Sequence, residues 1–350
     1  MSGADNPIRR ILVIKLGALG DFAQAFGVMQ AIRAAHADAE ITLLTTPPYE
    51  EVSRDSGLFD RIETDGRLRG PGDYWRVFRR LRAARYDRVY DLHTSSRTTW
   101  YLPFFWPRIP EWSGISPGAS FRQTRPDRTR LHNLDRLWDQ INVAGIGPVH
   151  PIGQAPAPDL GWAIRAAGED VVERFGLTPP FALLAPAASA TGEAKRWPLE
   201  RYADLAGWLA GRGIQPVVVG GPGERAVAAF IRERAPATVD LTGRTRVVDL
   251  AGLAAKARLM VGNDTGPTHW GAYAGAPGLM LMSVISRVGH CEPRARLQTL
   301  TVDDLKELPL ETVTAALEAQ GVVGDRSGAA EPKSSPFETP LRSAPQDEDF

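Results

Sequence analysis

Short runs of apolar residues alternate along this chain with longer segments in which apolar residues recur at helical spacing. The first run, residues 11–14 (Ile-Leu-Val-Ile), has the length and β-branched composition of a buried parallel strand. Residues 22–35 follow, and their apolar side chains fall on one face of a helix. A strand followed by such a helix predicts a parallel sheet whose faces are covered by helices.

The same alternation extends through both halves of the chain. In the first half we expect further strands at 40–45, 87–92 and 109–115, helices at 47–53, 73–85 and 131–143, and a loop at 116–130. In the second half we expect strands at 181–185, 216–220, 259–261 and 279–282, and helices at 199–210, 224–234, 247–255 and 270–276. The fold class is therefore α/β, with two Rossmann-like, doubly wound sheets and ligands at the carboxyl ends of the strands.

The segment between the two series of strands and helices predicts the domain organisation. Residues 148–158 are rich in Pro, Gly and Ala with little periodicity, which is typical of an interdomain linker. We expect a first domain at 1–150, a linker and first helix at 151–178, a second domain at 179–321 and a disordered tail at 322–350.

Composition narrows the function classes. Lys plus Arg and Asp plus Glu both number 41, so the net charge gives no indication of nucleic-acid binding. Residues 61–136 hold 16 Arg, no Lys and 8 acidic residues, which suits either a carboxylate- or phosphate-binding surface or an ordinary solvated one. Cys291, the single cysteine, excludes an internal disulfide. With no signal peptide and no apolar run of ~18 to 20 residues, we expect a cytoplasmic protein, with peripheral membrane contact left open.

Two strand-turn-helix sequences have the character of phosphate sites. In residues 261–269, a polar turn lies between a strand and a helix start, where free N–H groups and the helix dipole attract an anion. We assign the N–H groups of Thr265 and Gly266 to phosphate, and Asp264 to a sugar hydroxyl or to the turn. The alternative is that Asp264 and Thr265 cap the helix. His269 comes one turn later, within reach of the same ligand, although a structural role is more common for a lone histidine.

The second such sequence, residues 15–21, ends in Gly20 and Asp21. A carboxylate at the carboxyl edge of a sheet can act as a general base if it faces the partner domain. The competing interpretation is a helix N-cap, which is common for Asp. The G-x-G-x-x-G pattern of dinucleotide-binding proteins is missing, which disfavours a nicotinamide-dependent oxidoreductase.

Three further residues of the second half are candidate site residues, Lys195 as a catalytic group and Ser189 and Glu224 as donor-binding groups. Ser189 lies in a turn of small residues that lets the backbone approach a ligand, and Lys195 offers a point charge for a departing diphosphate. Glu224, after a strand and two glycines, is placed to accept hydrogen bonds from ribose hydroxyls. Each also has a plain structural interpretation, as loop, solvated surface and first-turn residue of a helix. No cluster of His, Asp or Glu has metal-ligand spacing, so we expect no metal and no cofactor.

Residues 100–107 (Trp-Tyr-Leu-Pro-Phe-Phe-Trp-Pro) are unusually aromatic and lie between Arg97 and Arg108. This composition suits a membrane interface or a lipid acceptor. A buried core segment is the more common role of such a sequence.

Together these motifs resemble the ADP-heptose:lipopolysaccharide heptosyltransferases of glycosyltransferase family 9. The similarity runs from about residue 8 to 278 and is carried by the segments 15–21, 86–93, 195–198, 220–224 and 262–269. Trp270 and Tyr273 stand where the family usually has small or aliphatic residues. The resemblance implies a GT-B fold, in which two Rossmann-like domains face a cleft, and implies that Asp21 is the base.

The function implied is an inverting transfer of a sugar, heptose from ADP-heptose, to a lipopolysaccharide core acceptor without a metal. The expected partners are a nucleotide-sugar donor and an anionic glycolipid acceptor, with no nucleic acid; peripheral contact with the cytoplasmic face of the inner membrane is left open. Alternatives are a transferase or epimerase acting on another nucleotide sugar, and a non-catalytic protein that binds a sugar nucleotide.

Overall fold

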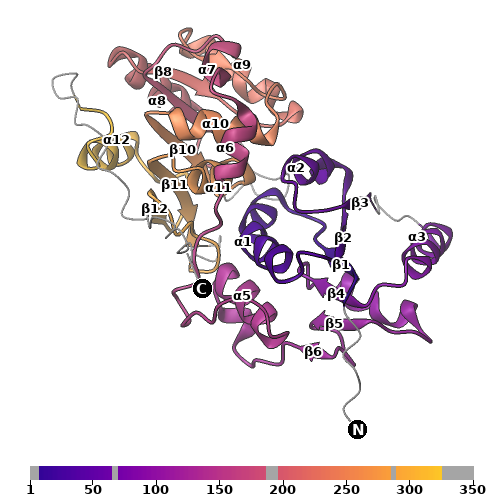
Figure 1. Cartoon of the computed structure of the whole chain (residues 1–350). Coiled ribbons are helices and arrows are strands. Elements are labelled where there is room, and N and C mark those ends of the chain that lie inside the picture. The colour runs from indigo at the N-terminus through magenta and orange to yellow at the C-terminus, as the bar shows by residue number, and fades with distance from the viewer. Residues whose placement is uncertain (1–7, 65–69, 187–195, 285–288, 325–350) are drawn as a thin grey trace, which may run out of the picture.

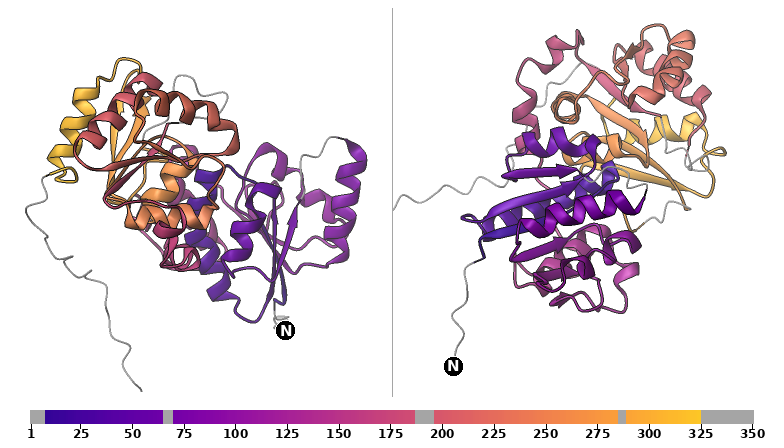
Figure 2. Two further views of the ribbon diagram at one scale, coloured as in Figure 1. Left: turned by 90° about the horizontal axis from the view of Figure 1, so that it is seen from above. Right: turned by 90° about the vertical axis from the view of Figure 1, so that its right-hand side faces the viewer.

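The computed structural model describes residues 8–64, 70–186, 196–284 and 289–324, and these form two parallel six-stranded sheets with helices on their faces (Figure 1). The two sheets belong to the two halves of the chain, which lie side by side (Figure 2). This is the predicted α/β architecture, and the prediction of two doubly wound sheets is confirmed.

The first sheet has the strand order β3-β2-β1-β4-β5-β6. Its strands are β1 (Arg10–Ile14), β2 (Glu40–Thr45), β3 (Arg61–Thr64), β4 (Arg88–Asp91), β5 (Glu111–Gly114) and β6 (Phe121–Arg122). Its helices are α1 (Leu19–Ala35), α2 (Glu50–Asp55), α3 (Pro71–Ala83), α4 (Ser96–Thr99) and α5 (Asn133–Val143), with 3₁₀ turns η1 (Pro47–Tyr49), η2 (Leu102–Phe105) and η3 (Arg128–Arg130). In the central strand, Ile11 lies opposite Ile41 of β2 and Arg88 of β4.

The second sheet, β12-β11-β10-β7-β8-β9, repeats this topology. Its strands are β7 (Phe181–Ala185), β8 (Gln215–Val218), β9 (Val239–Asp240), β10 (Leu259–Asn263), β11 (Gly278–Ser283) and β12 (Leu297–Val302). Its helices are α6 (Gly161–Ala167), α7 (Val171–Arg174), α8 (Leu199–Gly211), α9 (Arg225–Arg234), α10 (Val247–Lys256), α11 (Gly266–Tyr273) and α12 (Leu310–Ala319), with the 3₁₀ turn η5 (Pro222–Glu224). In each sheet the strand order reverses at one place, between β1 and β4 and between β7 and β10. Crevices at such points are where open α/β sheets bind ligands.

The departures from prediction are local. Strands β3, β9 and β12 were not predicted, and β6 lies inside the segment expected to be a loop. Helix α1 begins at Leu19 instead of residue 22, and α11 begins at Gly266 instead of residue 270. The expected tail from 325 onward lies outside the described residues.

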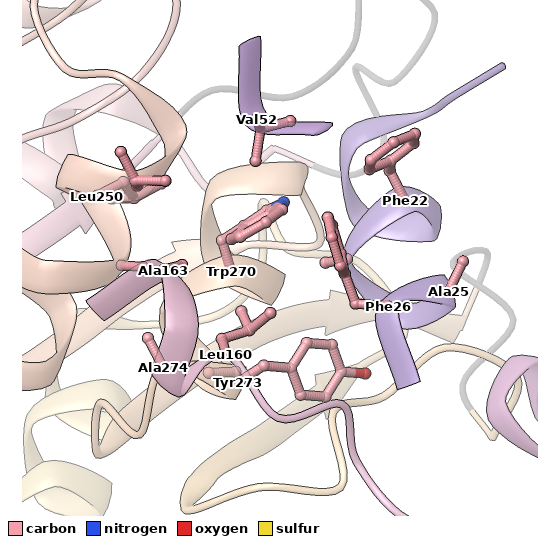
Figure 3. Close-up of a cluster of buried hydrophobic side chains, with 14 of the residues drawn as sticks. Phe22, Ala25, Phe26, Val52, Leu160, Ala163, Leu250, Trp270, Tyr273 and Ala274 are labelled. Carbon is pink, nitrogen blue, oxygen red and sulfur yellow. The ribbon is translucent and has the colours of Figure 1, made fainter. Parts of the chain in front are cut away.

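A single apolar cluster joins the two halves. Figure 3 shows its centre, where Phe22 and Phe26 of α1 face Trp270 and Tyr273 of α11. The rings of Phe26 and Trp270 meet edge to face at 5.5 Å, and the indole N–H of Trp270 donates to the carbonyl of Leu19 at 3.2 Å. Trp270 is fully buried, so the large residues that depart from the family pattern fill the contact between the halves.

A polar clasp holds the same contact from another side, where the chain before β12 reaches α5. The N–H of Asn133 donates to the carbonyl of His290 at 2.7 Å. The Arg294 guanidinium donates to the Asp135 carboxylate at 2.9 Å, and the Asp135 side chain is only 3% exposed. This ion pair and the apolar cluster together fix the orientation of the two sheets, whose carboxyl edges face each other.

Candidate active site

The turn after β1 and the turn after β10 meet across the two halves. A Cβ atom on Gly20 would lie 2.7 Å from Cδ2 of His269, and one on Gly266 would lie 2.5 Å from Cβ of Leu19. A side chain on either glycine would therefore clash with the opposite turn and push the two turns apart. Three predicted site residues, Gly20, Gly266 and His269, are brought into one place by this contact.

Asp21 lies in the first turn of α1, next to this contact. The residue at the N-cap position is Ala18, so the N-cap interpretation of Asp21 is wrong. Its carboxylate is exposed, and Oδ1 accepts a hydrogen bond from Nδ2 of Asn133 at 3.3 Å. An oriented, solvent-accessible carboxylate at this edge has the geometry required of a base.

Cationic groups lie beneath Asp21. Lys15, at the end of β1, is buried, and its ammonium donates to the carbonyl of Leu92 at 3.3 Å. Burial lowers the pKa of Lys15, while its attraction to Asp21 acts in the opposite direction. Burial likewise lowers the pKa of Arg136 on α5, again opposed by Asp21. The field from these cations favours an anion at this edge.

Residues at and just after the end of β4 lie next to Lys15. Asp91 is buried and accepts hydrogen bonds from the N–H groups of His93 and Thr94 at 3.1 and 3.0 Å. Burial raises the pKa of Asp91 to about 6. Burial and then the Lys15 charge lower the pKa of His93 to about 4, so its imidazole is neutral at pH 7. Lys15, Asp91 and His93 are not among the residues predicted from the sequence, although a lysine that ends an apolar strand is a visible signal.

In the second half, Asp264 and His269 form a buried pair. His269 Nε2 lies 3.1 Å from Asp264 Oδ1, and the two side chains are 5% and 8% exposed. Nδ1 of His269 is buried without a hydrogen-bond partner in the described part of the chain. Thr265, not Asp264, occupies the N-cap position of α11, and its side chain makes no cap hydrogen bond. The Thr265 side chain therefore does not occupy the N–H groups at the start of α11, where an anion would bind.

Glu224 lies after β8 and is half-buried. Its Oε2 accepts a hydrogen bond from the N–H of Gly221 at 2.7 Å, and burial raises the pKa of the carboxyl. Ser189 and Lys195 lie outside the described residues. The chain on either side of them is anchored to Asn263, which donates to the carbonyl of Pro186 at 2.7 Å and accepts from the N–H of Trp197 at 3.2 Å.

The aromatic segment is only partly buried. Tyr101 and Phe105 are buried, whereas Trp100 and Trp106 are 71% and 70% exposed. The buried-core interpretation is therefore wrong for these two tryptophans. Across the described ranges, no three His, Cys, Asp or Glu residues group as metal ligands would. Within the same ranges, none of the helices combines the length and the apolar character needed to cross a bilayer.

Comparisons with known proteins bear on the fold and on the class of reaction. Residues 155–298 match glycosyltransferase family 9 (heptosyltransferase). Lipopolysaccharide heptosyltransferase 2 of Salmonella typhimurium is 26% identical over 284 residues, which cover 77% of this chain and 81% of that protein. The structure of a family 9 glycosyl transferase from Veillonella parvula superposes with a TM-score of 0.72 at 22% identity, over 89% of this chain and 97% of that one.

The structure of E. coli ADP-heptose lps heptosyltransferase II superposes with a TM-score of 0.71 at 20% identity, over 89% of this chain and 98% of that one. The two superpositions confirm the predicted GT-B fold. The family match, which covers most of the second half, and the Salmonella relative confirm the resemblance stated above and support glycosyl transfer over the alternatives.

Proposed function

From the premise that this chain is a glycosyltransferase similar to family 9, we propose that it transfers heptose from ADP-heptose to a lipopolysaccharide core acceptor with inversion. The observation that carries the proposal is the meeting of the two turns. There Gly20, the neighbour of Asp21, lies against His269, and Leu19 lies against Gly266, the first residue of α11. A base and an anion site on opposite sides of one contact are what direct sugar transfer requires.

In the proposed reaction the acceptor hydroxyl oxygen attacks the anomeric carbon of the sugar. The bond from that carbon to the diphosphate oxygen breaks, the diphosphate leaves with the electron pair, and Asp21 takes the hydroxyl proton. The N–H groups of Thr265 and Gly266 stabilise the charge that grows on the diphosphate. Lys195 is assigned to the same charge on its sequence position alone.

The donor nucleotide is assigned to the second half. Glu224 accepts hydrogen bonds from the ribose, in exchange for the Gly221 N–H that it now holds. Asp264 is assigned to a sugar hydroxyl or to the turn that precedes α11. Ser189 is assigned to donor binding on its sequence position alone. No metal is assigned a role, so turnover is expected to persist in EDTA.

The acceptor is assigned to the first half. Lys15 and Arg136 supply positive charge around Asp21, which suits an anionic inner-core glycan. An acceptor of this kind is a glycolipid, which supports our proposal that the protein works at the cytoplasmic face of the inner membrane.

A thermal-shift panel with ADP, UDP, GDP and NAD⁺ tests the donor assignment. A ligand at ~100 times its dissociation constant stabilises the folded state by about 2.7 kcal/mol, which is readily measured. Stabilisation by ADP alone, followed by turnover of ADP-heptose with a core acceptor, is the expected result. Stabilisation by UDP or GDP would reject heptose transfer, and a response to NAD⁺ alone would reject the transferase.

A further inference from the structure

An exposed aromatic face covers the outer side of the first half. It is formed by Trp75 of α3 and by Trp100, Phe104 and Trp106 in and around η2, with exposed fractions of 62%, 71%, 44% and 70%. Single exposed apolar residues are ordinary on protein surfaces, but four large aromatic rings on two neighbouring elements form a patch that marks an interaction site.

The aromatic face surrounds a hollow of about 1130 Å³ between α3 and the α4–η2 segment. Trp75, Trp100 and Phe104 line it, together with the more buried Phe78. Phe104 stacks on Phe78 with ring centroids 4.1 Å apart, so this wall is held by the core beneath it. The hollow is therefore a built part of the surface and does not depend on a loose loop.

Arginines share this face with the aromatic rings. Arg79, Arg82 and Arg97 line the hollow, and the Arg79 guanidinium lies 4.6 Å from the Trp75 ring centroid. Helix α3 carries four arginines against one acidic residue, Asp73. Indole rings beside guanidinium groups fit the headgroup region of a membrane, where the ring sits at the boundary and the cation meets phosphate.

The position of the face suits a membrane that presents the acceptor. Helix α3 lies on the side of the first half that is turned away from the second half (Figures 1 and 2). The α4–η2 segment follows β4 and then His93, whose imidazole is close enough to Asp21 to interact with its charge. A flat surface on this face would therefore leave the contact between the halves uncovered.

We propose that the aromatic face docks on the surface of an anionic phospholipid bilayer. Trp75, Trp100 and Trp106 insert at the headgroup boundary, and Arg79 and Arg82 pair with lipid phosphates. The proposal deepens the proposed function and rests on it only for the lipid nature of the acceptor, because docking is measured without donor or acceptor.

Co-sedimentation of the full chain with vesicles tests this docking. The vesicles contain equal parts of phosphatidylglycerol and phosphatidylethanolamine, and a second set contains phosphatidylcholine alone. We expect binding to the anionic set, weakened by salt. The W75S/W100S variant should partition about 100-fold less, at about tenfold for each indole lost, and R79Q/R82Q about fivefold less for each charge.

Matched substitutions on other surfaces serve as controls. V149S removes a side chain that is 81% exposed in the segment between the halves, and R165Q/R232Q removes two exposed charges from the second half. Both controls should bind vesicles as the unmodified chain does. Absence of binding by the unmodified chain, equal losses in the controls, or equal binding to phosphatidylcholine would overturn the proposal. Retention of the ADP-induced thermal shift in W75S/W100S shows that the variant is folded. If ADP produced no shift in the unmodified chain, the proposed transferase function would be rejected, and the docking proposal would be unaffected.

Discussion

Replacing Gly20 by alanine tests whether the contact between the two turns organises the site. Gly20 lies in the first turn of α1, and its Cβ would be 2.7 Å from Cδ2 of His269, about 0.7 Å closer than the 3.4 Å at which ordinary contact begins. The imidazole has little room to yield. Its Nε2 is hydrogen-bonded to Asp264 at 3.1 Å, and its ring stacks against that of Tyr273.

Two opposing effects set the size of the change. A glycine-to-alanine change at a helical position normally stabilises the folded state by about 0.4–1 kcal/mol, because the unfolded chain loses freedom. Overpacking a rigid contact costs about 1–3 kcal/mol. We therefore expect G20A to range from neutral to about 2.5 kcal/mol less stable. Because the clash separates Asp21 from α11, we also expect kcat/KM to fall by about 10- to 100-fold.

Gly207 provides the matched control, because it lies inside helix α8 and a Cβ atom at this position would have nothing within 4 Å. G207A should gain about 0.4–1 kcal/mol and keep full turnover. The free energy of unfolding is measured by urea titration of both variants, and turnover by release of ADP. If G20A gained stability to the same extent as G207A and kept its turnover, the close contact of the two turns would be refuted.

Three further changes have defined outcomes. Asp21→Asn should lower turnover by about 10²- to 10⁴-fold while the ADP-induced thermal shift is unchanged, and near-native turnover would reject the base assignment. Burial raises the pKa of Asp91 from 3.8 to about 6, so its contribution to stability is lost as pH rises through that window. Asp91→Asn should therefore gain stability relative to the unmodified chain between about pH 4 and 6, by on the order of 2 kcal/mol, and a pH-independent difference in urea titrations would contradict this. Arg294→Gln leaves the buried Asp135 carboxylate unpaired and should lower the free energy of unfolding by about 3–5 kcal/mol. Arg212→Gln breaks the exposed pair with Glu318 and should lower it by less than about 1 kcal/mol. Equal losses would show that the Arg294–Asp135 pair stabilises the fold no more than a surface pair does.

The central strands could be predicted from the sequence because they are buried on both faces. β2 and β7 have the predicted bounds; β7 is apolar throughout, and in β2 every residue after Glu40 is buried. The strands that were not predicted lie toward the edges of the sheets and are partly exposed. β3 reads Arg-Ile-Glu-Thr, and β9 has only two residues, so neither offers an apolar run or an alternation long enough to recognise.

The two turns that form the site could be predicted from the sequence, whereas the contact between them could not. The turns around Asp21 and Asp264 stand out because polar residues follow apolar strands. Gly266 and Pro267 have the composition of a turn, and the helix was therefore predicted to begin at residue 270. Proline is also favoured in the first turn of a helix, and α11 begins at Gly266. The pairing of Gly20 with His269 joins residues nearly 250 positions apart, and no local pattern carries that information.

The apolar cluster that runs through both halves also limits how freely the halves can be exchanged. Although the two sheets share one topology, severing the chain at 148–158 would uncover Phe26 on one fragment and Trp270 on the other, and neither fragment would keep a complete interior. The protein should melt in one calorimetric transition, and a chimera with half of a relative should hold together only where the partner supplies a matching aromatic surface. Repetition of the topology therefore does not make the halves modular.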